Sequence, residues 1–256
     1  MKLLTFKATT HSTTPARIGT PTGSAAMEAL LGRPGPVELK TFGTPWEANL
    51  SGLLNLKHPK AVQAGLTDRK EPIQIYTHVV LHPEHGFFLV DTGVAERLVA
   101  DPAGVGVGAM LRKYGGVDKM RAEPGTARII ASQGVPLAGV FMTHLHLDLP
   151  PDVPICTGAR EAEASLFLNL FAQGTNNHLR DPHPGHTTGH VSCLARITAG
   201  PALMTGDVCH TRWGWDNDVE PGTFLAERDA SRDSLLAMKA LSKRHPAMTV
   251  KLGHQP

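Results

Sequence analysis

Three potential metal ligands alternate along one short stretch of this 256-residue chain. The stretch FMTHLHLD places His144, His146 and Asp148 two residues apart, directly after the apolar run AGV. Because a strand points alternate side chains to opposite faces, these three share one face, and the two intervening leucines point to the core. Imidazoles and a carboxylate that converge at a strand end suit Zn²⁺ or another divalent transition metal. A single such pattern also arises by chance, so its value depends on the residues that follow it.

Three further candidate ligands lie in a turn or just after a predicted strand later in the chain. The segment PGHTTGH places His186 in a glycine-flanked turn, LMTGDVCH places Asp207 just past a strand, and VKLGHQP places His254 past the last strand. A rigid sheet presents side chains at its strand ends to a common cleft. We therefore expect these residues to meet the first three in one metal site.

Strands and helices alternate along most of the chain without a linker or a repeat. The predicted strands are 73–82, 87–93, 138–144, 190–197, 202–207 and 248–252, and the predicted helices are 126–134, 160–174 and 230–245. This pattern indicates one mixed α/β domain over residues 1–256. Residues 71–256 form its expected core, whereas residues 1–70, whose first fifty are rich in Thr, Gly and Pro, are expected to be an irregular N-terminal arm or lid with one short helix near AAMEALLG.

Composition and charge limit the kinds of partner that the chain is expected to bind. Charged residues make up 19% of the chain and the formal charge is +2, without the basic footprint of a nucleic-acid or membrane-surface binder. No apolar run is long enough to span a bilayer, and the N-terminus does not look like a secretory signal. Three cysteines without CxxC spacing argue against a disulfide framework, so a cytoplasmic protein is expected. The expected partner is a small-molecule substrate, and a homodimer stays open.

Taken in order, these motifs resemble those of the metallo-β-lactamase fold superfamily. That family carries HxHxDH, then a His in a GHTxG turn, then an Asp after GD, then a late His. The segment FFLVDTG resembles the family's early strand, in which an Asp like Asp91 supports the backbone of the metal loop. The match runs from about residue 71 to the end. It implies a single-domain αββα sandwich with a metal cleft along one edge of the two sheets.

The resemblance also implies a ligand set for one or two zinc ions or another divalent transition metal. The implied ligands are His144, His146, His186, Asp148, Asp207 and His254. The first three would bind one metal, Asp148 and His254 a second, and Asp207 would bridge the two. A metal-bound hydroxide would then attack a carbonyl carbon, with Asp148 orienting it and moving a proton. The implied activity is hydrolysis of a small ester or lactone, N-acyl homoserine lactones included, whereas glyoxalase II-like thioesters are a lesser candidate.

One ligand of the family motif is missing. Leu149 stands where the family has its last motif His, and the Pro150-Pro151 pair that follows favours extended backbone over the usual helical turn. The 40 residues from His146 to His186 (186 − 146) are also few for this superfamily. The alternative is therefore a catalytically impaired or inactive scaffold that binds one metal or a small molecule.

The segment after Asp207 supplies the candidates for substrate contact. His210 lies where lactonase-like members carry a Tyr or His, and it could donate a hydrogen bond to the leaving oxygen as a catalytic residue. The alternative is a partly exposed loop histidine. Trp213 and Trp215 could wall an apolar substrate pocket, or they could pack this loop against the sandwich. His58 and His78 show no ligand spacing, so they are expected at the surface.

Overall fold

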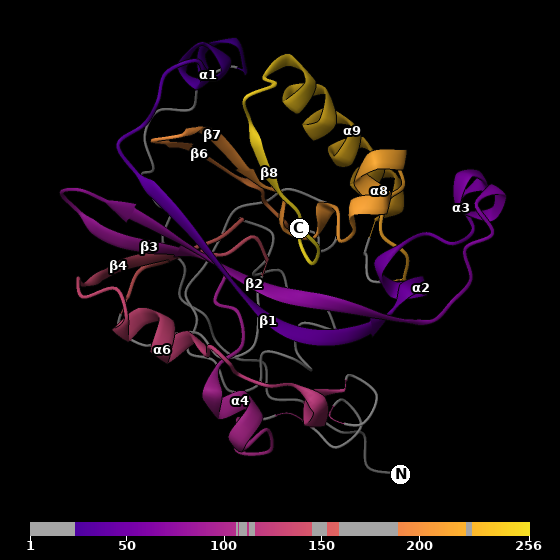
Figure 1. Ribbon diagram of the computed structural model, residues 1–256, viewed down its shortest axis with the longest axis horizontal. Helices are drawn as coiled ribbons and strands as arrows, with labels where there is room; N and C mark the ends of the chain where they lie inside the picture. Colours follow the sequence, from indigo (N-terminus) through magenta and orange to yellow (C-terminus); the bar gives the residue numbers. More distant parts are fainter. Residues whose placement is uncertain are drawn as a thin grey trace.

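Two β-sheets and the helices that cover them make up the fold. The structure is a computed structural model that describes residues 24–105, 107, 112, 116–144, 153–158, 189–223 and 227–256. The larger sheet has the order β1-β2-β3-β4-β5 and the smaller one the order β6-β7-β8. Figure 1 shows the two sheets between outer helices.

The larger sheet combines antiparallel and parallel pairing. Strands β1 to β3 pair antiparallel, and β3, β4 and β5 pair parallel. The strands are β1 (Glu38–Asn49), β2 (Lys70–His82), β3 (Gly86–Val90), β4 (Leu137–Phe141) and β5 (Ile155–Cys156). The strands predicted at 73–82 and 87–93 are confirmed by β2 and β3, which form an antiparallel hairpin, and the strand predicted at 138–144 is confirmed by β4.

The smaller sheet brings the C-terminal part of the chain together. It consists of β6 (Cys193–Ile197), β7 (Gly200–Met204) and β8 (Thr249–Lys251), with β7 antiparallel to β6 and parallel to β8. All three strands were predicted. Asp207 follows β7 and His254 follows β8, so the parallel pairing brings both to the same edge of this sheet.

Helices cover the outer face of each sheet, as the predicted αββα sandwich requires (Figure 1). On the smaller sheet, Leu235 of the long helix α9 packs with Leu203 in one core cluster. On the larger sheet, Ile129 of α6 packs against Val79 and Val140. The helical segments are α1 (Ser24–Leu31), α2 (Leu50–Leu53), α3 (Pro59–Gln63), α4 (Glu96–Ala100), η1 (Val117–Lys119), α6 (Thr126–Ala131), η3 (Gly206–Val208), α8 (Arg212–Asn217) and α9 (Arg228–Arg244).

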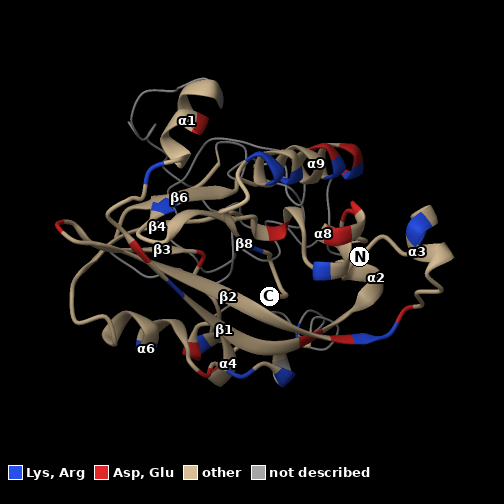
Figure 2. Ribbon diagram, turned by 45° about the horizontal axis from the view of Figure 1, so that its top comes forward, with Lys and Arg blue, Asp and Glu red and all other residues tan. Residues whose placement is uncertain are grey.

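The predicted helices at 126–134 and 230–245 are confirmed by α6 and α9. Helix α9 has Asp229 in its first turn and Lys243 and Arg244 in its last, which is the charge order that its dipole favours. In Figure 2 the ribbon of α9 carries both acidic and basic positions. The predicted helix at 160–174 lies outside the described residues.

The expectation of an irregular arm through residue 70 is wrong for β1. This twelve-residue strand pairs with β2 along its whole length, from Glu38 opposite Leu81 to Asn49 opposite Lys70. The sequence ELKTFGTPWEAN does not alternate regularly between apolar and polar residues and Pro45 interrupts it, so the local pattern does not indicate a strand. β1 forms one edge of the sheet, where a proline is tolerated because its missing N–H need not pair.

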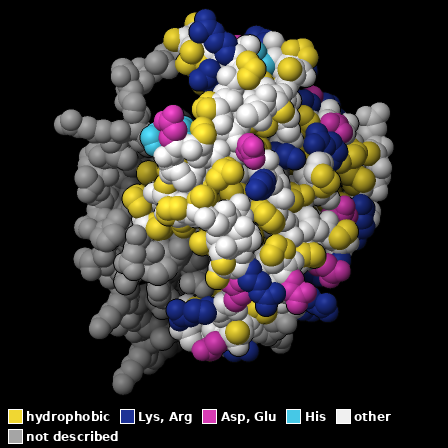
Figure 3. Space-filling view, turned by 60° about the vertical axis from the view of Figure 1, so that its left-hand side comes forward, with side chains coloured by type: hydrophobic (Ala, Val, Ile, Leu, Met, Phe, Trp, Pro, Cys, Tyr) yellow, Lys and Arg dark blue, Asp and Glu magenta, His cyan; other side chains and the backbone are white. Residues whose placement is uncertain are grey.

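The surface of the described part carries mixed charge. Figure 3 shows one face, on which Lys and Arg side chains lie among Asp and Glu side chains and apolar ones. Among the described helices, none has the length and apolar character needed to cross a membrane.

Candidate metal centre

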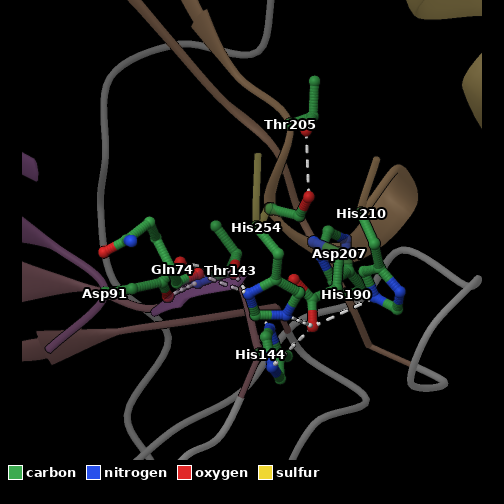
Figure 4. Close-up of polar contacts among 10 residues, drawn as sticks. Gln74, Asp91, Thr143, His144, His190, Thr205, Asp207, His210 and His254 are labelled. Carbon is green, nitrogen blue, oxygen red and sulfur yellow. Dashed lines mark hydrogen bonds and ion pairs between the residues drawn. The ribbon is translucent and has the colours of Figure 1, made fainter. Parts of the chain in front are cut away.

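Side chains from both sheets converge on the carboxylate of Asp207, which follows β7 (Figure 4). Its Oδ2 atom lies 3.6 Å from Nε2 of His144, 3.3 Å from Nε2 of His210 and 3.4 Å from Nε2 of His254. His144 comes after β4 of the larger sheet, and the other histidines come from loops of the smaller sheet. Asp207 is buried, with 7% of its surface exposed.

The arrangement has the chemistry of a transition-metal site. One ligand atom each from Asp207, His210 and His254 lie within 4.8 Å of one another. Imidazole nitrogen and carboxylate oxygen are the donors that zinc and related divalent ions take in proteins. A buried carboxylate is costly unless a positive charge compensates it, and a bound cation supplies that charge.

His254 is oriented by the backbone of β2. Its Nδ1 donates to the carbonyl oxygen of Gln74 at 2.8 Å, which turns Nε2 toward Asp207. The backbone N–H of Gln74 in turn donates to the carbonyl of His254. Burial lowers the pKa of His254, but the charge and hydrogen bond of Asp207 and the Gln74 carbonyl outweigh it, so the pKa lies above its ordinary value. Such a hydrogen bond on the far nitrogen is typical of metal-binding histidines.

His144 is oriented through Thr143 and Asp91. Asp91 accepts hydrogen bonds from the backbone N–H and the hydroxyl of Thr143, both at 2.8 Å. Since the only hydroxyl hydrogen of Thr143 goes to Asp91, its oxygen accepts from Nδ1 of His144 at 3.0 Å. Nε2 of His144 is thereby left for a metal. The expectation that Asp91 supports the backbone of the metal loop is confirmed.

Asp91 is held in an unusual environment. Burial raises its pKa to about 7, and the negative charge of Asp207 adds to this, while the hydrogen bonds from Thr143 oppose it. Its φ of 55° is in the left-handed region, which non-glycine residues seldom occupy. The tight turn at the end of β3 thus directs this carboxylate toward Thr143.

His190 supports the backbone of Asp207. Its Nε2 accepts the backbone N–H of Asp207 at 2.9 Å, and its ring stacks on that of His144 with centroids 5.5 Å apart. Gly206 permits this approach, because a Cβ there would lie 2.6 Å from Nε2 of His190, at a φ of 55°. The position of His190 in the sequence, four residues after His186 and just before β6, does not reveal this role.

His78 was missed as a residue of this region. It was expected at the surface, but it is buried on β2 and lines a small cavity together with Asp91, His144 and Asp207. Burial, with a contribution from the positive charge of Lys251, lowers its pKa to about 4. His58 was likewise expected at the surface and is buried, where its ring accepts the N–H of Lys60 as the N-cap of α3.

The structure assigns Trp215 to packing. Trp215 is 7% exposed and lies in the core cluster that contains Leu235, and Trp213 packs against the cluster formed by Leu50, Leu54 and Val219. Trp215 thus follows the packing alternative, whereas Trp213 is partly buried and its contact with a substrate stays a prediction.

His146, Asp148 and His186, and with them Leu149, lie outside the described residues.

Comparison with solved structures reveals similar folds. A quorum-quenching N-acyl homoserine lactone lactonase aligns over 87% of this chain and 94% of its own, with 19% identity and a TM-score of 0.64. A probable metal-dependent hydrolase from Staphylococcus aureus aligns over 87% and 91%, with 12% identity and a TM-score of 0.68. A dizinc quorum-quenching lactonase in complex with a product aligns over 88% and 89%, with 15% identity and a TM-score of 0.54. No protein-family model and no curated protein matches this sequence.

Proposed function

We propose that this chain, which has the metallo-β-lactamase fold, is a metal-dependent hydrolase of a small ester or lactone. One observation carries the proposal: a single buried carboxylate oxygen, Oδ2 of Asp207, faces the Nε2 atoms of three histidines. Three imidazole nitrogens and a carboxylate oxygen are thus close enough together to bind a common ion. A divalent transition ion satisfies all of these groups together.

The residues present fit such an ion. Asp207 and the imidazoles that surround it would hold it, with zinc as the proposed metal, and Thr143 and the Gln74 carbonyl would keep the rings of His144 and His254 in place. When bound, the ion lowers the pKa of water toward neutrality and polarises a carbonyl group. The protein's own contribution is to keep Asp207 buried and its partners prearranged, so that little reorganisation is needed.

A small substrate suits the space beside this cluster. An open depression of about 410 Å³ is lined by His254, Gln74 and Arg212. This volume lies in the range of small-molecule sites. The likeness to lactonases supports an ester or lactone, including N-acyl homoserine lactones, as the substrate class. The lack of a basic footprint and of disulfide spacing supports a small-molecule partner and a cytoplasmic location.

The proposal is tested by replacing the central carboxylate. Asp207→Asn keeps the size of the side chain but removes its charge, and we expect it to abolish both metal binding and hydrolysis. Metal content per chain is measured by elemental analysis, and hydrolysis on a panel of an N-acyl homoserine lactone, an aryl ester and a thioester. Asp216→Asn is the matched control, because Asp216 is exposed on α8, and it should behave like the parent.

Two outcomes would contradict the proposal. Full hydrolysis by Asp207→Asn would place the chemistry elsewhere. A folded parent that contains metal but hydrolyses nothing on the panel would favour the alternative of an impaired scaffold.

A further inference from the structure

His210 is buried too deeply to be a surface residue of the loop after β7. Only 1% of it is exposed, and its ring points into the cluster around Asp207 (Figure 4). The expectation of a partly exposed loop histidine is therefore wrong. A substrate contact would also require an accessible ring edge, which this side chain does not present among the described residues.

The distances around His210 match those of ligands on a shared ion. Two donors about 2.1 Å from a tetrahedral zinc ion lie about 3.4 Å apart. The Nε2 atoms of His210 and His254 lie 3.3 and 3.4 Å from Oδ2 of Asp207. The two rings are tilted by 51° with centroids 5.0 Å apart, so they approach the carboxylate from different directions instead of stacking.

The backbone holds these side chains in place before any ion binds. The N–H of His254 donates to the carbonyl of His210 at 3.1 Å, and the N–H of Gly253 donates to the carbonyl of Cys209 at 2.9 Å. Gly253 also leaves room for the carboxylate, since a Cβ there would lie 2.6 Å from Oδ1 of Asp207. A prearranged set of ligands loses little conformational entropy on binding.

From these observations we propose that His210 is itself a metal ligand, so that Asp207, His210 and His254 hold one divalent transition ion between them. Two imidazoles and one carboxylate form a three-ligand set that leaves a coordination position open, as catalytic metal sites do. The inference rests on the proposed function, in that it names the ligands of the same site. His210 thereby supplies a metal-ligand atom that Leu149, which has only a hydrocarbon side chain, lacks.

Zinc stoichiometry tests this inference without reference to activity. The parent, His210→Gln and His210→Ala are dialysed to equilibrium against buffered zinc, and zinc per chain is measured. Loss of a partner that merely orients a ligand weakens metal binding 10- to 100-fold, so loss of a direct ligand should raise the Kd by more than about 100-fold. We expect both variants to bind one zinc ion fewer per chain than the parent. His85→Ala, which removes an exposed histidine in the β2–β3 turn, should bind as the parent does.

A second measurement uses the unaltered protein, in case the variants fail to fold. Anomalous scattering at the zinc edge from crystals of the zinc-loaded parent should place an ion about 2.1 Å from Nε2 of His210. An ion bonded to other residues but not to His210 would overturn the inference.

The outcomes separate this inference from the proposed function. Unchanged zinc content in both His210 variants, with a raised KM, would assign His210 to substrate contact and would leave the hydrolase proposal standing. A parent that binds zinc through His210 but hydrolyses nothing would support the inference and contradict the hydrolase. A parent that binds no zinc would contradict both.

Discussion

At the scale of single residues, the centre depends on side chains that never touch a metal. Thr143 is the clearest case, because its hydroxyl donates to Asp91 and accepts from His144. This one oxygen connects a buried carboxylate to the orientation of an imidazole ring. The hydroxyl, more than the bulk of the side chain, should therefore matter for metal affinity.

Thr143→Val removes that hydroxyl while preserving the branched shape of the side chain. We expect metal binding to weaken by about 10- to 100-fold, as is usual when a partner of a ligand is lost. The Kd for zinc, measured by competition with a chelator, gives the result. Thr143→Ser retains the hydroxyl and should stay close to the parent. Equal affinities of the parent and Thr143→Val would show that His144 needs no such support.

At the scale of elements, one glutamate connects α1 to the end of α9. Glu28 accepts two hydrogen bonds from Arg244, at 2.7 and 2.9 Å, and lies 3.1 Å from Nε2 of His245. These hydrogen bonds lower the pKa of Glu28 to about 2 from its ordinary value of 4.5. A carboxyl group with a lowered pKa stabilises the fold above its unfolded-state pKa and loses this effect as the pH falls.

Glu28→Gln should therefore loosen the attachment of α1 at neutral pH. We expect faster amide hydrogen exchange in residues 24–31, with α9 unchanged. The difference from the parent should shrink as the pH falls from about 4.5 to about 2, because the parent loses its carboxylate charge in that window. Glu84→Gln, in the exposed β2–β3 turn, is the control. A difference that persisted unchanged down to pH 2 would contradict an electrostatic attachment.

At the scale of the whole molecule, the site joins the two sheets. His144 follows a strand of the larger sheet, Asp207 and His254 follow strands of the smaller one, and the Gln74 carbonyl belongs to β2. An ion held between these groups would therefore bind the folded sandwich and not its separated halves. Metal binding should accordingly be coupled to global stability.

Zinc at about 100 times its Kd should add about 2.7 kcal/mol to the free energy of unfolding for each ion bound. The rise in thermal midpoint with added zinc measures this effect. Mg²⁺, which prefers oxygen ligands, serves as a control ion and should produce no comparable rise. The same zinc-dependent shift in Asp207→Asn would contradict a site centred on this carboxylate.

Much of the fold could be predicted because its signals are local. The hairpin of β2 and β3 has a short turn between apolar runs, and α9 has its period and end charges within seventeen residues. β1 could not be predicted in this way. Its pairing partner β2 begins twenty-one residues after β1 ends (70 − 49), and only that distant strand makes its irregular pattern compatible with a sheet.

The same division holds for the candidate site. The sequence by itself determined which residues have ligand chemistry at strand ends, because spacing and residue type identify His144, Asp207 and His254 without any long-range contact. Only the tertiary structure decided that His210 is buried beside Asp207, that His190 and the Gln74 carbonyl orient the cluster, and that Trp215 faces the core. These facts depend on how strands distant in the chain pair and which way a loop turns between them, and no local pattern of residues contains that information.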